Sequence, residues 1–261
     1  MANTLSATSQ ISTRLLARSH DYLELTKPKV VLLLMLTAVV GMFLSTHAPI
    51  PTQVLLLGSV SLAMAMAAGA VVNHVVDQRI DAIMKRTHRR PIVQGKIKPL
   101  NALIFAFILL SISMTTLCLS VNVLTALLTL FGFVGYAVIY TLFLKRATPQ
   151  NIVIGGVAGA IPPLLGWTAV TGHFDPYALL PVLIIFTWTP PHFWPLALHR
   201  RDDYAAAGIP MLPVTHGDEF TRSSIFNYTL LLCIVTMLPF VTGMSGLIYL
   251  ATAILLNALF V

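Results

Sequence analysis

The fold is decided by residues 54–81, VLLLGSVSLAMAMAAGAVVNHVVDQRID, in which a long apolar run meets a polar motif. The apolar part, Val54 to Val76, exceeds the roughly 20 residues that a helix needs to cross the hydrocarbon layer of a membrane. The polar motif places Asn73, Asp77 and Asp81 four residues apart. On a helix this spacing puts the three side chains on one face, with neighbouring Cβ atoms about 5–6 Å apart. The stretch therefore predicts a membrane-spanning helix that ends in a polar ridge.

The composition extends this interpretation to the whole chain. Of its 261 residues, 57% are hydrophobic and only 10% are charged, which is too little charge for a soluble domain of this size. We predict an all-α, polytopic membrane bundle made of two related halves of about four helices, with eight visible spans and a ninth missing at the C-terminus. The predicted spans are residues 30–46, 53–76, 101–119, 122–143, 151–171, 177–198, 225–243 and 246–261.

The distribution of charge predicts the orientation. All 16 Lys and Arg residues lie in the N-terminal segment or in the second, fourth and sixth interhelical loops. The positive-inside rule places these parts in the cytoplasm. We therefore expect a multi-pass protein of the bacterial inner (cytoplasmic) membrane, with residues 1–24 as a cytoplasmic tail and residues 25–261 as a single transmembrane domain. The mitochondrial inner membrane is the alternative, because the N-terminus is rich in Ser and Thr, as in a transit peptide.

The acidic residues point to a site on the same face. Eight of the nine acids, all but Asp175, lie with the bases, although lipid attraction and orientation need only Lys and Arg. The alternative is that acids simply occur where the loops meet water. Two carboxylates one helical turn apart, such as Asp77 and Asp81, are suited to hold Mg²⁺, which takes its remaining ligands from water and a substrate phosphate. A second acidic pair, Asp202 and Asp203, follows the sixth span.

Basic and aromatic residues near these acids are candidates to bind an anion, although Lys and Arg could serve topology alone and Tyr could belong to an interfacial belt. The candidates are Arg86, Arg90, Lys145, Arg146, Tyr136 and Tyr140. Gly155 and Gly159 predict either a tight helix crossing or a place where a bulky ligand approaches the backbone. Three prolines between residues 190 and 195 should break or kink the sixth span, and freed carbonyls at membrane depth require protein or a cavity beside them.

Acids and bases at the mouth of an apolar helical bundle predict a lipid-tailed diphosphate as substrate. Metal and basic side chains would neutralise the departing diphosphate, and aromatic faces such as Tyr140 or Trp194 would steady the allylic cation left behind. The predicted reaction class is prenyl transfer. A transporter is the rival from another class, but it needs acids near mid-membrane, whereas these lie at helix ends. No feature indicates nucleic-acid binding.

The motif Asn73-x-x-x-Asp77-x-x-x-Asp81 resembles the first aspartate-rich motif of the UbiA-type intramembrane prenyltransferases. Longer strings between Leu25 and Gly217 resemble, more narrowly, the protohaem IX farnesyltransferases, or haem O synthases. These strings are Leu25-Thr26-Lys27-Pro28, Met84-Lys85-Arg86-Thr87 with Arg90-Pro91, Leu144-Lys145-Arg146 through Asn151-Ile152-Val153-Ile154-Gly155-Gly156, Pro190-Pro191-His192-Phe193-Trp194, and Asp203-Tyr204 with Ala207-Gly208-Ile209-Pro210-Met211-Leu212-Pro213.

The resemblance implies an enzyme that joins the farnesyl group of farnesyl diphosphate to a vinyl group of haem B, giving haem O. Haem A synthase or terminal oxidase assembly would then be a downstream partner. A quinone precursor is the alternative acceptor, because the diphosphate machinery would be shared. That family has nine helices, and its second aspartate motif is more regular than the pair Asp202 and Asp203 in this sequence.

The resemblance also implies roles for particular residues. Asn73, Asp77 and Asp81 would be catalytic and would bind Mg²⁺ and diphosphate, helped by Asp202 or Asp203. The residues expected to hold diphosphate or haem propionates are Arg86, Arg90, Lys145, Arg146 and Tyr140. The residues expected to contact haem, at iron or at an edge, are His192, His199 and Trp194, although a His near a membrane interface often has only a structural role.

Overall fold

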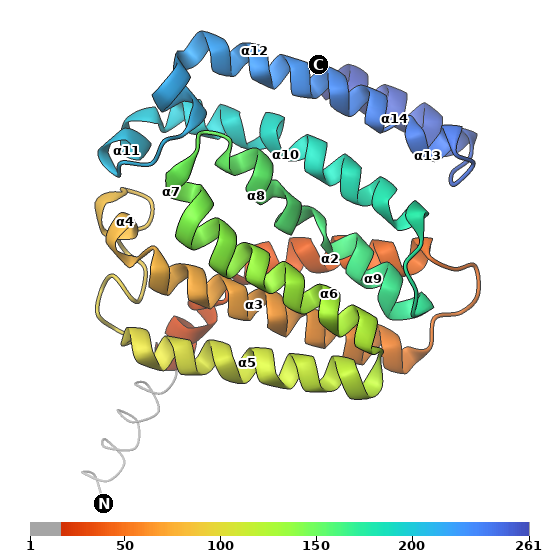
Figure 1. The fold of residues 1–261 in the computed structure, drawn as a ribbon, viewed down its shortest axis with the longest axis horizontal. Helices are drawn as coiled ribbons and strands as arrows, with labels where there is room; N and C mark the ends of the chain where they lie inside the picture. The colour runs from red at the N-terminus through yellow and green to blue at the C-terminus, as the bar shows by residue number, and fades with distance from the viewer. Residues whose placement is uncertain (1–16, 261) are drawn as a thin grey trace, which may run out of the picture.

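The computed structural model describes residues 17–260, and within this range helices joined by loops make up the fold, with no strand (Figure 1). A first helix, Ala17–Leu25, precedes the labelled elements. These are α2 (Pro28–Leu44), η1 (Val54–Gly58), α3 (Ser59–Val76), α4 (Gln78–Ile83), α5 (Pro99–Ser120), α6 (Val123–Val134), η2 (Gly135–Leu144), α7 (Lys145–Ala147), α8 (Asn151–Ala160), α9 (Pro162–Thr171), η3 (Pro176–Ala178), α10 (Leu179–His199), α11 (Arg201–Ala206), α12 (Leu212–Val235), α13 (Leu238–Val241) and α14 (Leu247–Phe260).

The structure confirms an all-α bundle of apolar helices but not the predicted number of eight spans. Five helical stretches are long and apolar enough to cross a membrane, and the first helix with α2, which are bent by 49°, would make a sixth. The five are Val54–Val76, Pro99–Ser120, Val123–Ala147, Asn151–Thr171 and Leu212–Val241. Helix α14 has only 14 residues, and α10 contains Pro, Trp and His residues that lower its hydropathy. The ninth span and the relation between the halves remain predictions.

The predicted N-terminal tail, residues 1–24, lies outside the described residues as far as residue 16. Its remainder forms most of the first helix, which ends at the fully buried Leu25. The proposed domain boundary therefore coincides with the last turn of a helix that packs on the bundle. The chain then bends into α2.

Glycines allow α2 to lie directly on α9. A Cβ atom added to Gly166 would be 1.8 Å from the carbonyl oxygen of Ala38, and one added to Gly41 would be 2.1 Å from the carbonyl oxygen of Pro163. Only glycine fits at such backbone contacts. Helix α2 is therefore held close to the bundle, where it forms one wall of the cavity described below.

Helix α10 differs from its predicted form. It runs without interruption from Leu179 to His199, with all three prolines inside it, so the predicted break at the prolines is wrong. The helix ends instead at Arg200, whose backbone (φ −116°, ψ 25°) turns the chain into α11. Prolines are tolerated inside membrane helices where protein or a cavity borders the freed carbonyls. The predicted cavity does lie beside this helix.

The short polar elements gather at one end of the bundle. Figure 1 shows α4, α7 and α11 together at the left, away from the opposite connection between α9 and α10. These elements directly follow α3, η2 and α10, so the C-terminal ends of three helical stretches lie at the same end of the bundle. Segments that are far apart in the sequence can therefore build one site.

Candidate active site

The predicted ridge forms across the junction of α3 and α4. Asp77 (φ −84°, ψ 2°) separates the two helices, yet its N–H donates to the Asn73 carbonyl at 3.0 Å, and the Asp81 N–H donates to the Asp77 carbonyl at 2.8 Å. The four-residue helical pattern therefore continues through the junction. All three side chains are buried.

Each acid of the ridge has a basic partner from another element. The Lys145 ammonium donates to Oδ2 of Asp77 at 2.6 Å, and the Arg90 guanidinium pairs with Asp81. Asn73 also donates to Oδ2 of Asp77, at 2.8 Å. Because an isolated charge is costly to bury, these partners explain how two carboxylates persist side by side inside the protein. Arg90 and Lys145, which the sequence predicts to bind an anion, thus pair with the acids of the ridge in this structure.

Lys27 completes this cluster, although no role was predicted for it from the sequence. It lies at the bend between the first helix and α2, and its ammonium donates to Oδ1 of Asn73 at 2.5 Å. Among residues 17–260 it is the one non-glycine residue with positive φ (φ 50°, ψ 60°). This backbone conformation costs about 1–2 kcal/mol for an L-residue, so the surrounding contacts must hold it. The sequence signal for this bend is the position of Lys27 directly before Pro28, because a residue that precedes proline is disfavoured in the right-handed helical conformation.

The donor set of the ridge fits Mg²⁺. Within the described part of the chain, Oδ1 of Asp77 is buried and has no hydrogen-bond partner. A buried carboxylate oxygen without a partner is costly, and a cation would satisfy it. Asp81 and Asn73 offer further oxygen atoms close by, and oxygen is the ligand that Mg²⁺ prefers.

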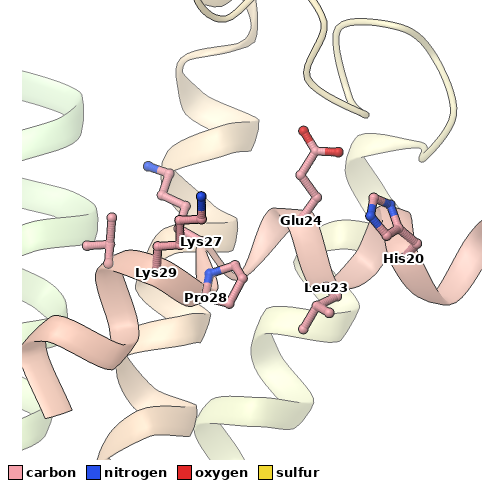
Figure 2. A pocket seen from close by; sticks show the side chains of 7 residues that line it. His20, Leu23, Glu24, Lys27, Pro28 and Lys29 are labelled. Atoms are coloured by element: carbon pink, nitrogen blue, oxygen red, sulfur yellow. The ribbon is translucent and has the colours of Figure 1, made fainter.

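A second group of possible metal ligands lies on the first helix. His20, Asp21 and Glu24 are close enough to share an ion, but His20 and Glu24 are exposed and Asp21 pairs with Lys96 at 3.2 Å. Figure 2 shows the small pocket at this bend, with His20 and Glu24 on the first helix and Lys27 beyond them. Exposed groups of this kind are common without a metal. The ridge is the better candidate for a cation site than this exposed group, because its carboxylates are buried and one oxygen has no hydrogen-bond partner among residues 17–260.

An apolar cavity of about 560 Å³ begins beside the ridge. Lys27, Tyr136 and Tyr140 line it, and its walls come from α2, α3, α6, η2, α8, α9 and α10. The remaining wall consists mostly of aliphatic residues and glycines. Since the charged cluster lies at one end of the cavity, the arrangement suits a molecule with an anionic head and an apolar tail.

Tyr140 lines the cavity close to the ridge. Its ring stacks with Tyr136, with centroids 5.9 Å apart and planes inclined by 13°. It is close enough to Asp77 and to Tyr204 of α11 to interact electrostatically with both. Gly155 makes this position possible, because a Cβ atom there would be 2.3 Å from the Tyr140 ring. At Gly155 the structure thus has the close helix packing that was one of the two predictions for this residue. Here α8 packs on the Tyr140 side chain of η2.

Gly155→Ala should consequently displace the Tyr140 ring. We expect the overpacking to lower the free energy of unfolding by about 1–3 kcal/mol. We also expect it to lower the turnover number, because the Tyr140 ring lines the cavity. In a Tyr140→Ala background the same substitution should have little further effect, because the ring it displaces is absent. A double-mutant cycle on thermal midpoint and turnover measures this coupling. Additive effects of the two substitutions would show that Gly155 does not act through Tyr140.

The second acidic pair lies on α11, at the same end of the bundle. Asp202 is exposed and Asp203 is half-buried. Within residues 17–260 neither forms a hydrogen bond or ion pair with the ridge. Tyr204 beside them is buried, and this burial raises the pKa of its phenol, with Arg86 and Asp203 close enough to influence it. Arg86, from the loop after α4, and Asp203, from α11, thus both lie near Tyr204.

The other candidates lie in different surroundings. His192 lines the cavity and stacks on Trp188, with ring centroids 4.0 Å apart. Trp194 is buried in a separate core cluster and is not among the lining residues, because two residues along a helix turn its side chain to the far side from His192. His199 is exposed at the end of α10. The guanidinium of Arg146 donates to the carbonyl of Val76, at 3.4 Å, and so caps the end of α3.

An apolar cavity among membrane helices, closed at one end by buried acids and bases, defines a membrane-embedded enzyme for an amphiphilic anionic substrate. The sequence profile of the UbiA prenyltransferase family matches residues 34–261. The chain belongs to this family.

Curated relatives refine the comparison. The chain is 64% identical over 247 residues to a protein of Alcanivorax borkumensis named protoheme IX farnesyltransferase, covering 93% of this chain and 82% of the relative. It is 58% identical over 260 residues to a protein of the same name from Hahella chejuensis, covering 100% of this chain and 85% of the relative.

Solved structures share the fold at low sequence identity. An apo structure of a UbiA homologue from Aeropyrum pernix superimposes with a TM-score of 0.76 at 19% identity, covering 89% of this chain and 86% of the other. A UbiA homologue from Archaeoglobus fulgidus bound to DMAPP and Mg²⁺ gives 0.73 at 20% identity, covering 92% and 84%. These similarities establish the fold.

Proposed function

We propose that this chain transfers the farnesyl group of farnesyl diphosphate to a vinyl group of haem B and so forms haem O. The main structural support for this proposal is the buried ridge at the end of the apolar cavity, in which Asp77 and Asp81 are each paired with a base. This geometry accounts for a diphosphate head and a prenyl tail. The acceptor rests on relatives that share up to 64% identity and are named protoheme IX farnesyltransferase.

Asn73, Asp77 and Asp81 are the residues proposed to hold Mg²⁺, helped by Asp202 or Asp203 of α11. Support comes from the unpartnered oxygen of Asp77 and from the homologue of the same fold that was solved with Mg²⁺ and DMAPP. When bound, the metal supplies electrostatic stabilisation of the leaving diphosphate.

The bases of the cluster have two roles in this proposal. In the structure, Lys145 and Arg90 neutralise the acids and Lys27 holds Asn73. With Mg²⁺ held by the acids, these ammonium and guanidinium groups would be the donors available to the diphosphate oxygens. They then stabilise the charge that develops as the C–O bond breaks. Arg86 and Arg146, at the outer edge, are proposed to bind diphosphate or haem propionates.

We propose the following steps for the reaction. The bond between farnesyl C1 and oxygen breaks, and its electron pair leaves with diphosphate. The terminal vinyl carbon of haem B forms a bond to C1, and water adds to the neighbouring carbon as hydroxyl with release of a proton. The face of Tyr140 steadies the allylic cation, and the apolar cavity keeps bulk water from it. His192, the candidate haem contact that lines the cavity, is proposed to orient the acceptor.

The proposal includes a cellular setting. The enzyme would lie in the bacterial inner membrane as a single transmembrane domain, residues 25–261. Its polar end and residues 1–24 would face the cytoplasm, as the distribution of Lys and Arg predicts. Haem O would pass to haem A synthase or to terminal oxidase assembly.

The test is pigment analysis of membranes from bacterial cells that lack their own haem O synthase and express this chain. We expect haem O in those membranes and none with an empty vector. A prenylated quinone precursor without haem O would favour the alternative acceptor. A folded, membrane-inserted protein that yields no haem O would overturn the proposed function.

A further inference from the structure

We propose that Gly159 determines the length of the prenyl chain that the cavity accepts. This inference rests on the proposed function, because it assigns the cavity to the prenyl tail. It concerns a residue that lies away from the charged cluster.

Three glycines of α8 line the cavity, and they differ in what they face. A Cβ atom on Gly155 would meet the Tyr140 ring at 2.3 Å, and one on Gly156 would meet the Thr189 side chain at 3.2 Å. A Cβ atom on Gly159 would meet nothing within 4 Å. Of these three, therefore, only Gly159 leaves open space in the cavity. The open space at Gly159 supports the alternative in which a ligand approaches the backbone there.

The register of α8 sets the depth of this opening. The helix starts at Asn151, whose side chain donates to the Lys145 carbonyl at 3.3 Å and so lies at the charged end. At a rise of 1.5 Å per residue, Gly155 lies about 6 Å and Gly159 about 12 Å further along α8. With the diphosphate at the ridge, the first isoprene unit lies near Tyr140. Later units must lie progressively deeper, and Gly159 is placed beside them.

Glycine at this position therefore leaves room for the distal part of a farnesyl chain. A branched side chain would occupy that room without touching the ridge, Tyr140 or the first isoprene unit. The expected consequence is selective: longer chains lose binding, and a chain of one isoprene unit does not. In hydrophobic pockets a single methylene changes discrimination by about 10-fold or more, so a whole leucine side chain should exceed that.

The experiment compares Gly159→Leu with Gly135→Leu in the full chain, purified in detergent. Gly135 is a matched control, because it too lies in a helical element and has nothing within 4 Å of an added Cβ, but it does not line the cavity. The readouts are kcat/KM with haem B for dimethylallyl, geranyl and farnesyl diphosphates, and thermal stabilisation by their thiolodiphosphate analogues. The second readout requires no transfer to any acceptor.

We expect Gly159→Leu to lower the preference for farnesyl over dimethylallyl by about 10-fold or more, in both readouts. Gly135→Leu should leave the preference unchanged. An unchanged preference in a folded Gly159→Leu protein, or an equal change in both variants, would overturn the inference. If the leucine variant does not fold, Gly159→Ala is tested instead. We then expect a smaller change of the preference in the same direction, and an unchanged preference would overturn the inference. A wild-type protein that binds the analogues by length but transfers nothing to haem B contradicts the proposed function alone.

Discussion

Asp77→Asn is expected to lower the rate of farnesyl transfer by about 10²–10³-fold in single-turnover measurements, because it removes the central charge of the ridge. The substitution is nearly isosteric and keeps one oxygen beside Lys145 and Asn73, which bond to Asp77 in the structure. The loss should therefore be of charge and metal affinity, with the fold retained. The concentration of Mg²⁺ for half-maximal activity should rise together with the fall in rate.

Asp218→Asn is the control for this prediction. Asp218 lies at the same polar end of the chain and also forms an ion pair, with Arg201 at 3.1 Å, but both side chains are 47% exposed. Exposed ion pairs contribute little, so the control should retain activity and its magnesium dependence. Equal losses in the two variants, or an unchanged Asp77→Asn enzyme, would remove Asp77 from the mechanism.

Lys145→Met is expected to have the largest effect on stability, about 3–5 kcal/mol, because it leaves the Asp77 carboxylate buried without its cation. The side chain of Asp77 is only 2% exposed and that of Lys145 only 14%, so water cannot readily replace the lost partner. The thermal midpoint in detergent, followed by circular dichroism, measures the change. Activity should fall as well, since the diphosphate loses one of its bases.

The double variant Lys145→Met with Asp77→Asn separates stability from catalysis. It removes both charges of the buried pair, so most of the lost stability should return. Activity should stay low, because both a metal ligand and a base are missing. A double variant that remains as unstable as Lys145→Met would mean that Lys145 acts through packing and not through Asp77.

Local features could be predicted from the sequence because they depend on neighbouring residues. The apolar run from Val54 to Val76 predicts a helix by its length alone, and the structure has a continuous helical stretch there. The spacing of Asn73, Asp77 and Asp81 predicts adjacent side chains by helical geometry, and a hydrogen bond joins the first two. The break predicted at the prolines of α10 was wrong, because proline alone does not decide whether a membrane helix is interrupted. The surrounding cavity and neighbouring helices also decide it.

The sequence by itself thus determined the helical membrane class and the polar ridge, because hydropathy and four-residue spacing are properties of single helices. It also carried the motifs that resemble those of prenyltransferases. Only the tertiary structure decided which bases meet the ridge. Lys27 is 46 residues from Asn73, and Lys145 is 68 residues from Asp77. It also placed His192 beside the cavity, Trp194 in the core and open space at Gly159. Such contacts depend on how separate helices pack, and no spacing within one helix encodes them.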